Sequence, residues 1–372
     1  MKQNKKKNSW QQYIGLAFTM LLCAIGGYVI GHFMASYEGE FTLIGFLGLA
    51  VGIYLAFMLH IIVHEGGHLV FGLLTGYKFS SFRIFSFMWL WEDGKLKLKR
   101  LSIAGTGGQC LMSPPDMKDG KMPIVLYNLG GSFSNMFFSA LFLLGYLFFA
   151  DVAFLSNMFV IFASVGIMTA LMNGIPMRLG TVDNDGYNAF ALAKNKEAME
   201  AFWVQLKVNE QITRGVRLKD MPDEWFDVPK DEAMKNSMVA ARGVFACNRL
   251  MDAERFEEAD ALMAHLLEID SGIVGLHRDL LVCDRMYVEL IGDARREVIE
   301  NMLTAQQKKF MKSMKRFPSV LRTEYALALL FDKDTEKAGN IMGEFDKVAK
   351  TYPYPHEAES ERDLMKIANN KA

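Results

Sequence analysis

Long runs of apolar residues dominate the first half of the chain, and short polar segments separate them. Four of these runs exceed the roughly 20 residues that a helix needs to cross a bilayer. We expect them to be transmembrane helices, at residues about 10–36, 41–76, 123–150 and 152–177. From about residue 197 the apolar positions recur with helical spacing among many charged residues. The pattern predicts a polytopic membrane domain over residues 1–190 and an α-helical domain over residues 197–372, hence a mainly α membrane protein.

Between the second and third apolar runs the periodicity changes. Residues 81–87 and 95–101 alternate polar with apolar side chains, as strands do, and Glu92-Asp93-Gly94 between them is typical of a turn. We therefore expect a membrane-associated β-hairpin in a re-entrant segment at about residues 79–114.

A glycine-rich stretch that includes Gly107 and Gly108 follows the predicted hairpin. Backbone without side chains can approach a partner closely. At membrane depth such a segment survives only where protein or a water-filled cavity satisfies its amides, so it fits the lining of an active-site cleft. The alternative is a flexible connector at the surface.

Charged residues near the ends of these runs predict the topology. Lysines crowd the amino terminus, basic residues follow the second run, and the two short turns on the other side are acidic: Glu38, Glu40 and Asp151. By the positive-inside rule both termini are cytoplasmic. We expect a multi-pass protein of the bacterial cell membrane, in contact with membrane lipid, whose first helix is retained rather than cleaved as a signal peptide.

Two other classes of site are not expected. The amino-terminal lysines precede a spanning helix and are explained as a topology signal, so we expect no nucleic-acid partner. The cysteines are scattered and form no CxxC pair, which argues against disulfides and cysteine-zinc sites; they are Cys23, Cys110, Cys247 and Cys283.

The second apolar run contains an HExxH motif, His64-Glu65-Gly66-Gly67-His68. Residues four apart share a helix face, so His64 and His68 can bind one zinc ion while Glu65 stands beside it as a general base. The alternative is a pair of hydrogen-bonded histidines that pack against neighbouring helices, but charged groups in membrane segments are usually functional.

A catalytic zinc site needs a third protein ligand. His60 lies four residues before His64, but eight helical residues place it about 12 Å from His68, too far to share one ion, and we interpret it as a packing or supporting residue. The better candidates follow the fourth helix, where Asp185 precedes a glycine in a turn that lets a short side chain point back into the site. Asp183 remains an alternative.

The HExxH motif, an Asn-x-x-Pro sequence at residues 173–176 and Asp185-Gly186 together resemble the site-2 protease family of intramembrane zinc metalloproteases. The resemblance covers roughly residues 41–190. It implies that Asp185 is the third zinc ligand, that Asn173 helps to hold the substrate backbone, and that the segment around residues 82–110 presents the substrate as a strand.

The chain departs from the family pattern in two places. The family commonly has Leu-Asp-Gly at a short distance after the proline, whereas Asn184-Asp185-Gly186 follows a longer spacing. On the third helix the family often has Gly-Pro and then an asparagine, whereas this chain keeps Gly130 and Asn135 without the proline. Asn135 is thus a candidate substrate-binding residue, and close packing of two helices is the alternative for this segment.

The soluble half shows weak repeat character. Residues 236–251 and 255–270 have the spacing of a tetratricopeptide-like helical hairpin, and two more hairpins are expected at about 275–317 and 318–352. No clean 34-residue period carries through. We expect a cytosolic domain that selects substrates or binds a protein partner.

The leading hypothesis is an intramembrane zinc endopeptidase that cuts membrane-spanning or membrane-associated proteins or peptides. One alternative is a membrane scaffold without catalysis that acts through its helical repeats. Another is a membrane zinc peptidase of a different class, such as the prenyl-protein endopeptidase type, which takes its third ligand from a glutamate on a later helix.

Overall fold

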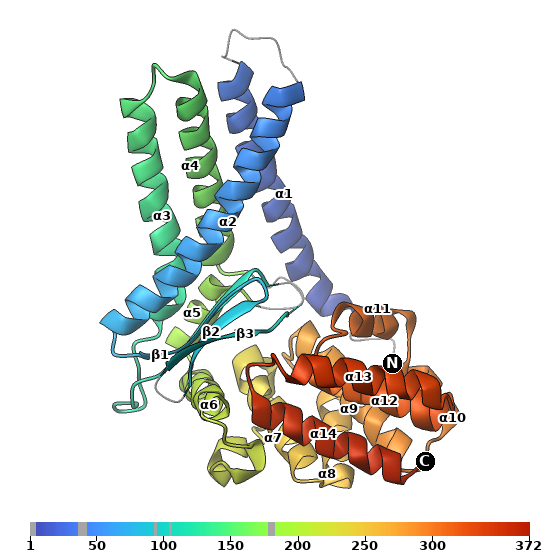
Figure 1. Ribbon diagram of the computed structural model, residues 1–372. Coiled ribbons are helices and arrows are strands. Elements are labelled where there is room, and N and C mark those ends of the chain that lie inside the picture. Colours follow the sequence, from blue (N-terminus) through green and yellow to red (C-terminus); the bar gives the residue numbers. More distant parts are fainter. Residues whose placement is uncertain (1–4, 36–42, 93–94, 104–105, 178–182) are drawn as a thin grey trace. The chain divides into compact units, whose positions relative to one another are not determined.

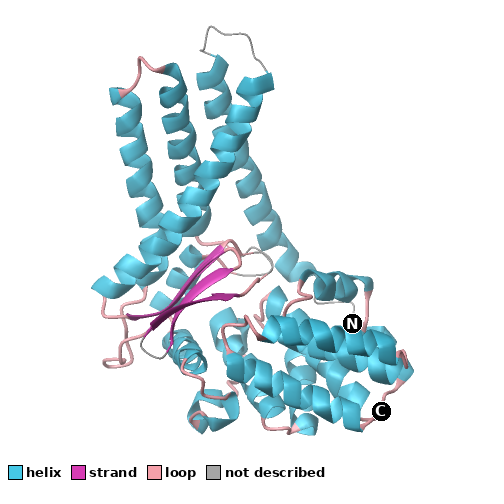
Figure 2. Ribbon diagram, in the orientation of Figure 1, coloured by secondary structure: helices cyan, strands magenta, loops and turns pink. Residues whose placement is uncertain are grey.

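The computed structural model describes residues 5–35, 43–92, 95–103, 106–177 and 183–372 (Figure 1). These residues are mostly helical, with one small sheet (Figure 2). The chain forms two compact units. The first comprises residues 1–78, 107–110 and 121–194, and the second comprises residues 79–106, 111–120 and 195–372.

The first unit contains the long apolar helices. They are α1 (Lys5–Ala35), α2 (Leu43–Leu74), α3 (Val125–Phe148) and α4 (Ala153–Gly174), and the short α5 (Asp185–Ala193) follows them. Within the described residues these four long helices have the length and composition to cross a membrane, in agreement with the four apolar runs of the sequence. Helices α2, α3 and α4 pack against one another, and α1 packs against α4.

This helical bundle has its polar groups inside and its large apolar side chains outside. Leu147 and Phe148 are exposed, and so is Leu74 at the end of α2. By contrast, His60 and Asn135 are fully buried. Lipid tails solvate apolar side chains as well as a protein core does, whereas polar groups in a membrane segment must find partners within the protein.

Helices α2 and α3 cross at a pair of glycines. A Cβ atom added at Gly67 would lie 2.3 Å from the carbonyl oxygen of Gly130, and one added at Gly130 would lie 2.7 Å from the carbonyl oxygen of Gly67. No side chain fits there, so the two backbones are in direct contact. Gly130 therefore serves the close helix packing that small residues allow in membranes.

The segment after α2 forms a four-stranded sheet rather than a two-stranded hairpin. Its strands are β1 (Lys78–Ile84), β2 (Phe87–Glu92), β3 (Lys95–Arg100) and β4 (Gly108–Ser113), in the order β3-β2-β1-β4. Strand β2 pairs antiparallel with both β1 and β3. The predicted pairing of residues 81–87 with 95–101 overlooked β2, because its run of Phe, Met, Trp and Leu shows no polar alternation.

Residues 93–94 of the predicted turn and residues 104–105 of the glycine-rich stretch lie outside the described residues, and so do residues 178–182. Of the charged residues used to predict the topology, Lys2, Glu38 and Glu40 also lie outside them. Most of the predicted re-entrant segment belongs to the second unit, and residues 107–110 belong to the first.

The second unit continues with helices from residue 196 onward. They are α6 (Lys196–Thr213), η1 (Leu218–Asp220), η2 (Asp223–Phe226), η3 (Ala233–Lys235), α7 (Ser237–Asp252), α8 (Phe256–Glu268), α9 (Gly275–Ile291), α10 (Arg296–Met302), α11 (Ala305–Ser313), α12 (Pro318–Ala326), η4 (Leu327–Phe331), α13 (Thr335–Ala349) and α14 (Pro355–Asn370). Helices α7 and α8 contact each other, as the predicted helical hairpin requires.

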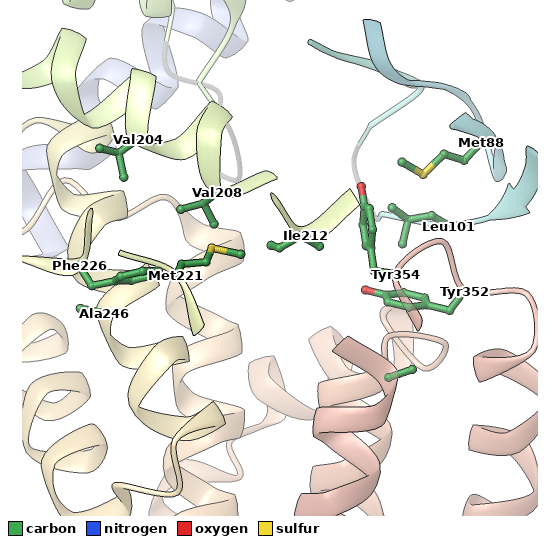
Figure 3. Packing of buried hydrophobic residues seen from close by; sticks show 11 residues of the cluster. Met88, Leu101, Val204, Val208, Ile212, Met221, Phe226, Ala246, Tyr352 and Tyr354 are labelled. Atoms are coloured by element: carbon green, nitrogen blue, oxygen red, sulfur yellow. The ribbon is translucent and has the colours of Figure 1, made fainter. Parts of the chain in front are cut away.

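One hydrophobic cluster joins the sheet to the helices of the second unit. Met88 of β2 and Leu101 after β3 belong to the same buried cluster as Val208 of α6, and Tyr352 and Tyr354 lie between these elements (Figure 3). A hydrogen bond from the amide of Arg100 to the carbonyl of Thr351, 2.9 Å long, also ties the end of β3 to this segment.

Candidate metal centre

The HExxH motif lies within α2, as its helical spacing predicts. His64 and His68 are both buried, and their Nε2 atoms are 3.2 Å apart. The two imidazoles therefore aim the same ring nitrogen at one point, which is the arrangement expected for residues at i and i+4 that share a metal.

Asp185, the first residue of α5, lies next to the two histidines. Its Oδ2 atom lies 2.9 Å from Nε2 of His64 and 3.4 Å from Nε2 of His68. Among the described residues these three form the group able to hold a metal ion, and neither Asp183 nor His60 belongs to it. The prediction that Asp185 stands closer to the histidines than Asp183 agrees with this geometry.

The three donor atoms have the spacing that a small tetrahedral ion requires. With bonds of about 2.0–2.1 Å, two ligands of a tetrahedral zinc ion lie about 3.3 Å apart. The observed separations are 2.9, 3.2 and 3.4 Å. Two imidazole nitrogens and a carboxylate oxygen suit zinc and several other divalent metals, so the residues fit a zinc ion without selecting it uniquely.

Asn184 positions Asp185 by joining α4 to α5. Its side-chain oxygen accepts hydrogen bonds from the amides of Tyr187 and Met177, both at 2.9 Å. Its side-chain nitrogen donates to the carbonyls of Met172 and Ile175. Asn184 thus caps α5 while it holds the end of α4. In the sequence, an asparagine directly before a helix is the signal for such a cap.

Gly186 completes this junction. A Cβ atom there would lie only 2.2 Å from the carbonyl oxygen of Gly174. The residue after Asp185 must therefore be a glycine for α5 to begin so close to the end of α4. This close approach gives the Asp-Gly pair a structural reason.

His68 has its metal-binding tautomer set by a backbone carbonyl. Its Nδ1 lies 2.7 Å from the carbonyl oxygen of Tyr127. A carbonyl only accepts, so Nδ1 carries the proton and Nε2 keeps a lone pair for a metal. Tyr127 in turn donates its hydroxyl to the carbonyl of Cys110, at 2.8 Å, which ties the glycine-rich segment to α3.

The glycine-rich segment lies close to α2, which agrees with the expectation that its backbone can approach a partner closely. A Cβ atom at Gly108 would lie 2.5 Å from Oε1 of Glu65, and one at Gly107 would lie 3.1 Å from the Ile61 side chain. Glu65 is buried, and the first residue of β4 lies against its carboxylate. The candidate base therefore has extended backbone beside it.

The charge states of nearby groups suit a metal site. Burial acts to raise the pKa of Asp185, but the adjacent imidazoles of His68 and His64 outweigh it and hold that pKa below the usual range. Burial, helped by the charge of Glu65, raises the pKa of the Cys110 thiol. Asp185 is thus a carboxylate, the form that can bind a metal, whereas Cys110 is a neutral thiol and does not belong to the donor group found among the described residues.

The two asparagines predicted to contact substrate have partners within the protein. Asn173 donates its side-chain amide to the carbonyl of Thr169 in its own helix, at 2.9 Å. Asn135 is fully buried, with its amide between His60 and His64. Substrate contact by these residues, and by Gly107 and Gly108, stays a prediction.

No protein-family model matches this chain, and neither curated proteins nor solved structures provide a match.

Proposed function

We propose that the protein is an intramembrane zinc metalloendopeptidase of the site-2 protease type. The observation that carries the proposal is the convergence of His64, His68 and Asp185 near the spacing of a tetrahedral site. His64, His68 and the neighbouring Glu65 lie on α2, which is apolar enough to span a membrane, and Asp185 joins them from α5. Three metal donors with a carboxylate beside them are the usual set of a hydrolytic zinc centre.

The residues divide the chemistry between them. A zinc ion held by the three donors would supply Lewis-acid polarisation of the scissile carbonyl and a lowered pKa for water. Glu65 acts as the general base: its carboxylate takes a proton from the attacking water and later gives it to the leaving amine. Burial keeps bulk water from competing with these proton transfers.

The edge strand β4 supports a mode of substrate binding. A substrate helix hides its carbonyls in its own hydrogen bonds, so it must unwind before it is cut. Strand β4 is at one end of the described sheet order and begins at Gly108, beside Glu65. An unwound substrate that adds to this edge as a further strand would bring its backbone to the base.

The trapping experiment uses Glu65→Gln in the full-length protein. The variant keeps the metal donors but lacks the base, so we expect it to retain metal and to co-purify with an uncut single-span protein or peptide. Glu257→Gln, an exposed glutamate of α8, is the matched control. The proposal fails if the unmodified protein binds no metal, or if candidates bound by Glu65→Gln are not cut by the active protein. A bound protein that is never cut would favour the scaffold alternative.

The membrane topology is part of the proposal. Basic residues near the amino terminus and after α2 support cytoplasmic termini, with Asp151 on the opposite side. A membrane-impermeant maleimide should label Asp151→Cys in intact cells and Glu257→Cys only after lysis, relative to the labelling of the unmodified chain. The reverse pattern would invert the topology.

We also propose that the second unit selects substrates or binds a cytosolic protein partner. Its support is a helical fold with an antiparallel helix pair at α7 and α8. Truncation of the helical part of this unit, residues 197–372, should change which substrates are cut, whereas metal content should stay the same.

A further inference from the structure

Three buried polar side chains form a chain behind the candidate metal centre, one on α3 and two on α2. Nδ1 of His60 lies 3.1 Å from the side-chain oxygen of Asn135, and the Asn135 side-chain nitrogen lies 3.4 Å from Nδ1 of His64. Nε2 of His60 lies 2.9 Å from the carbonyl oxygen of Phe162 on α4. All these groups belong to the first unit.

The carbonyl of Phe162 determines which group donates and which accepts along this series of hydrogen bonds. A carbonyl only accepts, so a neutral His60 must carry its proton on Nε2 and present a lone pair on Nδ1. Asn135 must then turn its NH₂ group toward His60 and its oxygen toward His64. The oxygen and nitrogen of an amide differ only by a flip, so the better assignment is the one that satisfies every contact.

This assignment has a direct consequence for His64. With the Asn135 oxygen facing it, Nδ1 of His64 carries the proton, and Nε2 keeps its lone pair at the metal position. The opposite amide orientation would place the His64 proton on Nε2, where a metal must bind, and would leave the unprotonated Nε2 of His60 against the Phe162 carbonyl. Nε2 of His64 also lies 2.9 Å from Oδ2 of Asp185, and with the Asn135 oxygen toward His64 a bound metal ion would satisfy the lone pairs of both atoms. Only this orientation leaves Nε2 of His64 free for a metal and keeps the Phe162 carbonyl paired with a donor.

Glycines make room for both histidines. A Cβ atom at Gly166 of α4 would lie 2.2 Å from Cε1 of His60, and one at Gly131 of α3 would lie 2.5 Å from Nδ1 of His64. Any side chain at Gly166 or Gly131 would therefore overlap the space that the imidazole rings of His60 and His64 occupy. Since His60 is also fully buried, its orientation is constrained on several sides.

We propose that His60 is a positioning residue: through Asn135 it holds the proton of His64 on Nδ1 and leaves Nε2 ready to bind the metal. The proposal rests on the proposed metal site. His60 contacts no metal and no substrate. It plays for His64 the role that the Tyr127 carbonyl plays for His68, with one extra side chain in between.

The test measures metal affinity in the full-length, detergent-solubilised protein, by competition for Zn²⁺ with a chromogenic chelator. His60→Leu removes both hydrogen bonds and should weaken Zn²⁺ binding by about 10- to 100-fold, the usual effect of losing a group that orients a metal ligand. His60→Gln should bind within about threefold of the unmodified protein, because its oxygen can accept from Asn135 while its nitrogen donates to Phe162.

A double variant tests whether His60 affects metal binding only through Asn135. If His60 acts only through Asn135, His60→Leu combined with Asn135→Leu should be no weaker than Asn135→Leu alone. Ser139→Ala is the local packing control, because the Ser139 hydroxyl bonds the backbone carbonyl of Asn135, at 2.7 Å, and not its amide side chain. It should leave Zn²⁺ affinity unchanged.

Visible absorption of the Co²⁺-substituted protein gives a second readout. The band positions should shift in His60→Leu and return in His60→Gln. Unchanged Zn²⁺ affinity in His60→Leu, equal losses in the Leu and Gln variants, or additive losses in the double variant would overturn the inference while the proposed function stands. Absence of metal binding in the unmodified protein would overturn both.

Discussion

The choice between Asp185 and Asp183 as the third metal ligand yields a sharp prediction. Asp185→Ala removes a donor atom that lies 2.9 Å and 3.4 Å from the two histidine nitrogens. The cap of α5 is Asn184, whose side chain accepts from the amide of Tyr187, so loss of Asp185 leaves the helix start intact. We expect Asp185→Ala to fold and to lose metal.

The expected loss of zinc affinity follows from the number of metal-donor atoms. Apparent zinc-binding free energies of about 10–16 kcal/mol in four-ligand protein sites correspond to about 2.5–4 kcal/mol per ligand. Loss of one ligand should therefore weaken Zn²⁺ binding by roughly 100- to 1,000-fold. Asp183→Ala changes a carboxylate two residues away that is not in the metal group, and its affinity should stay within about threefold of the unmodified protein.

The assay compares both alanine variants with the unmodified protein at equal concentration in the same detergent, by chelator competition and by metal content after gel filtration. Asp185→Asn is a further control, because it keeps the side-chain shape and removes the charge. Equal affinities of Asp185→Ala and the unmodified protein would refute the ligand assignment, and a loss confined to Asp183→Ala would transfer it to that residue.

Three further predictions concern a glycine beside His64 and two buried charges. Gly131→Ala places a methyl group 2.5 Å from Nδ1 of His64 and should weaken Zn²⁺ binding by about 10-fold or more, measured by the same competition. Burial raises the pKa of Glu357 to about 7, so the protonated carboxyl favours the folded state. Its contribution to the free energy of unfolding is fully present below about pH 4.5 and is lost as the pH rises through 7. Urea unfolding followed by tryptophan emission should show Glu357→Gln more stable than the unmodified protein at pH 8, by about 1–2 kcal/mol, and no more stable at pH 4.5. Arg322→Met leaves the buried carboxylate of Asp284 without its ion-pair partner and should destabilise the second unit by about 3–5 kcal/mol in the same assay; a change below about 1 kcal/mol would contradict this.

Several features followed from the sequence because they depend on local spacing. The lengths of the apolar runs predicted the four spanning helices, and the interval between His64 and His68 placed both imidazoles on one face of α2. The Gly107-Gly108 segment was expected to approach a partner closely, and its backbone lies against α2. Local periodicity was less informative for β2, which has apolar side chains on both faces and so lacks the alternation that identifies a strand.

Contacts between distant residues could not be read from the sequence in the same way. The sequence could propose Asp185 only by resemblance and turn chemistry, because 121 residues separate it from His64. The role of Asn184 depends on where α4 ends, and the contact of His60 with Asn135 spans 75 residues. Spacing excluded His60 as a ligand of the metal bound by His68, but it could not show what His60 touches.

The sequence by itself therefore determined which segments are apolar enough to enter a membrane and which donors share a helix face, since both depend on residues close in the chain. Only the tertiary structure brought Asp185 to the two histidines and placed Asn135 between His60 and His64, with the Phe162 carbonyl against His60. These outcomes depend on how α2, α3, α4 and α5 pack, and glycines at the contacts between them permit distances that no local pattern encodes.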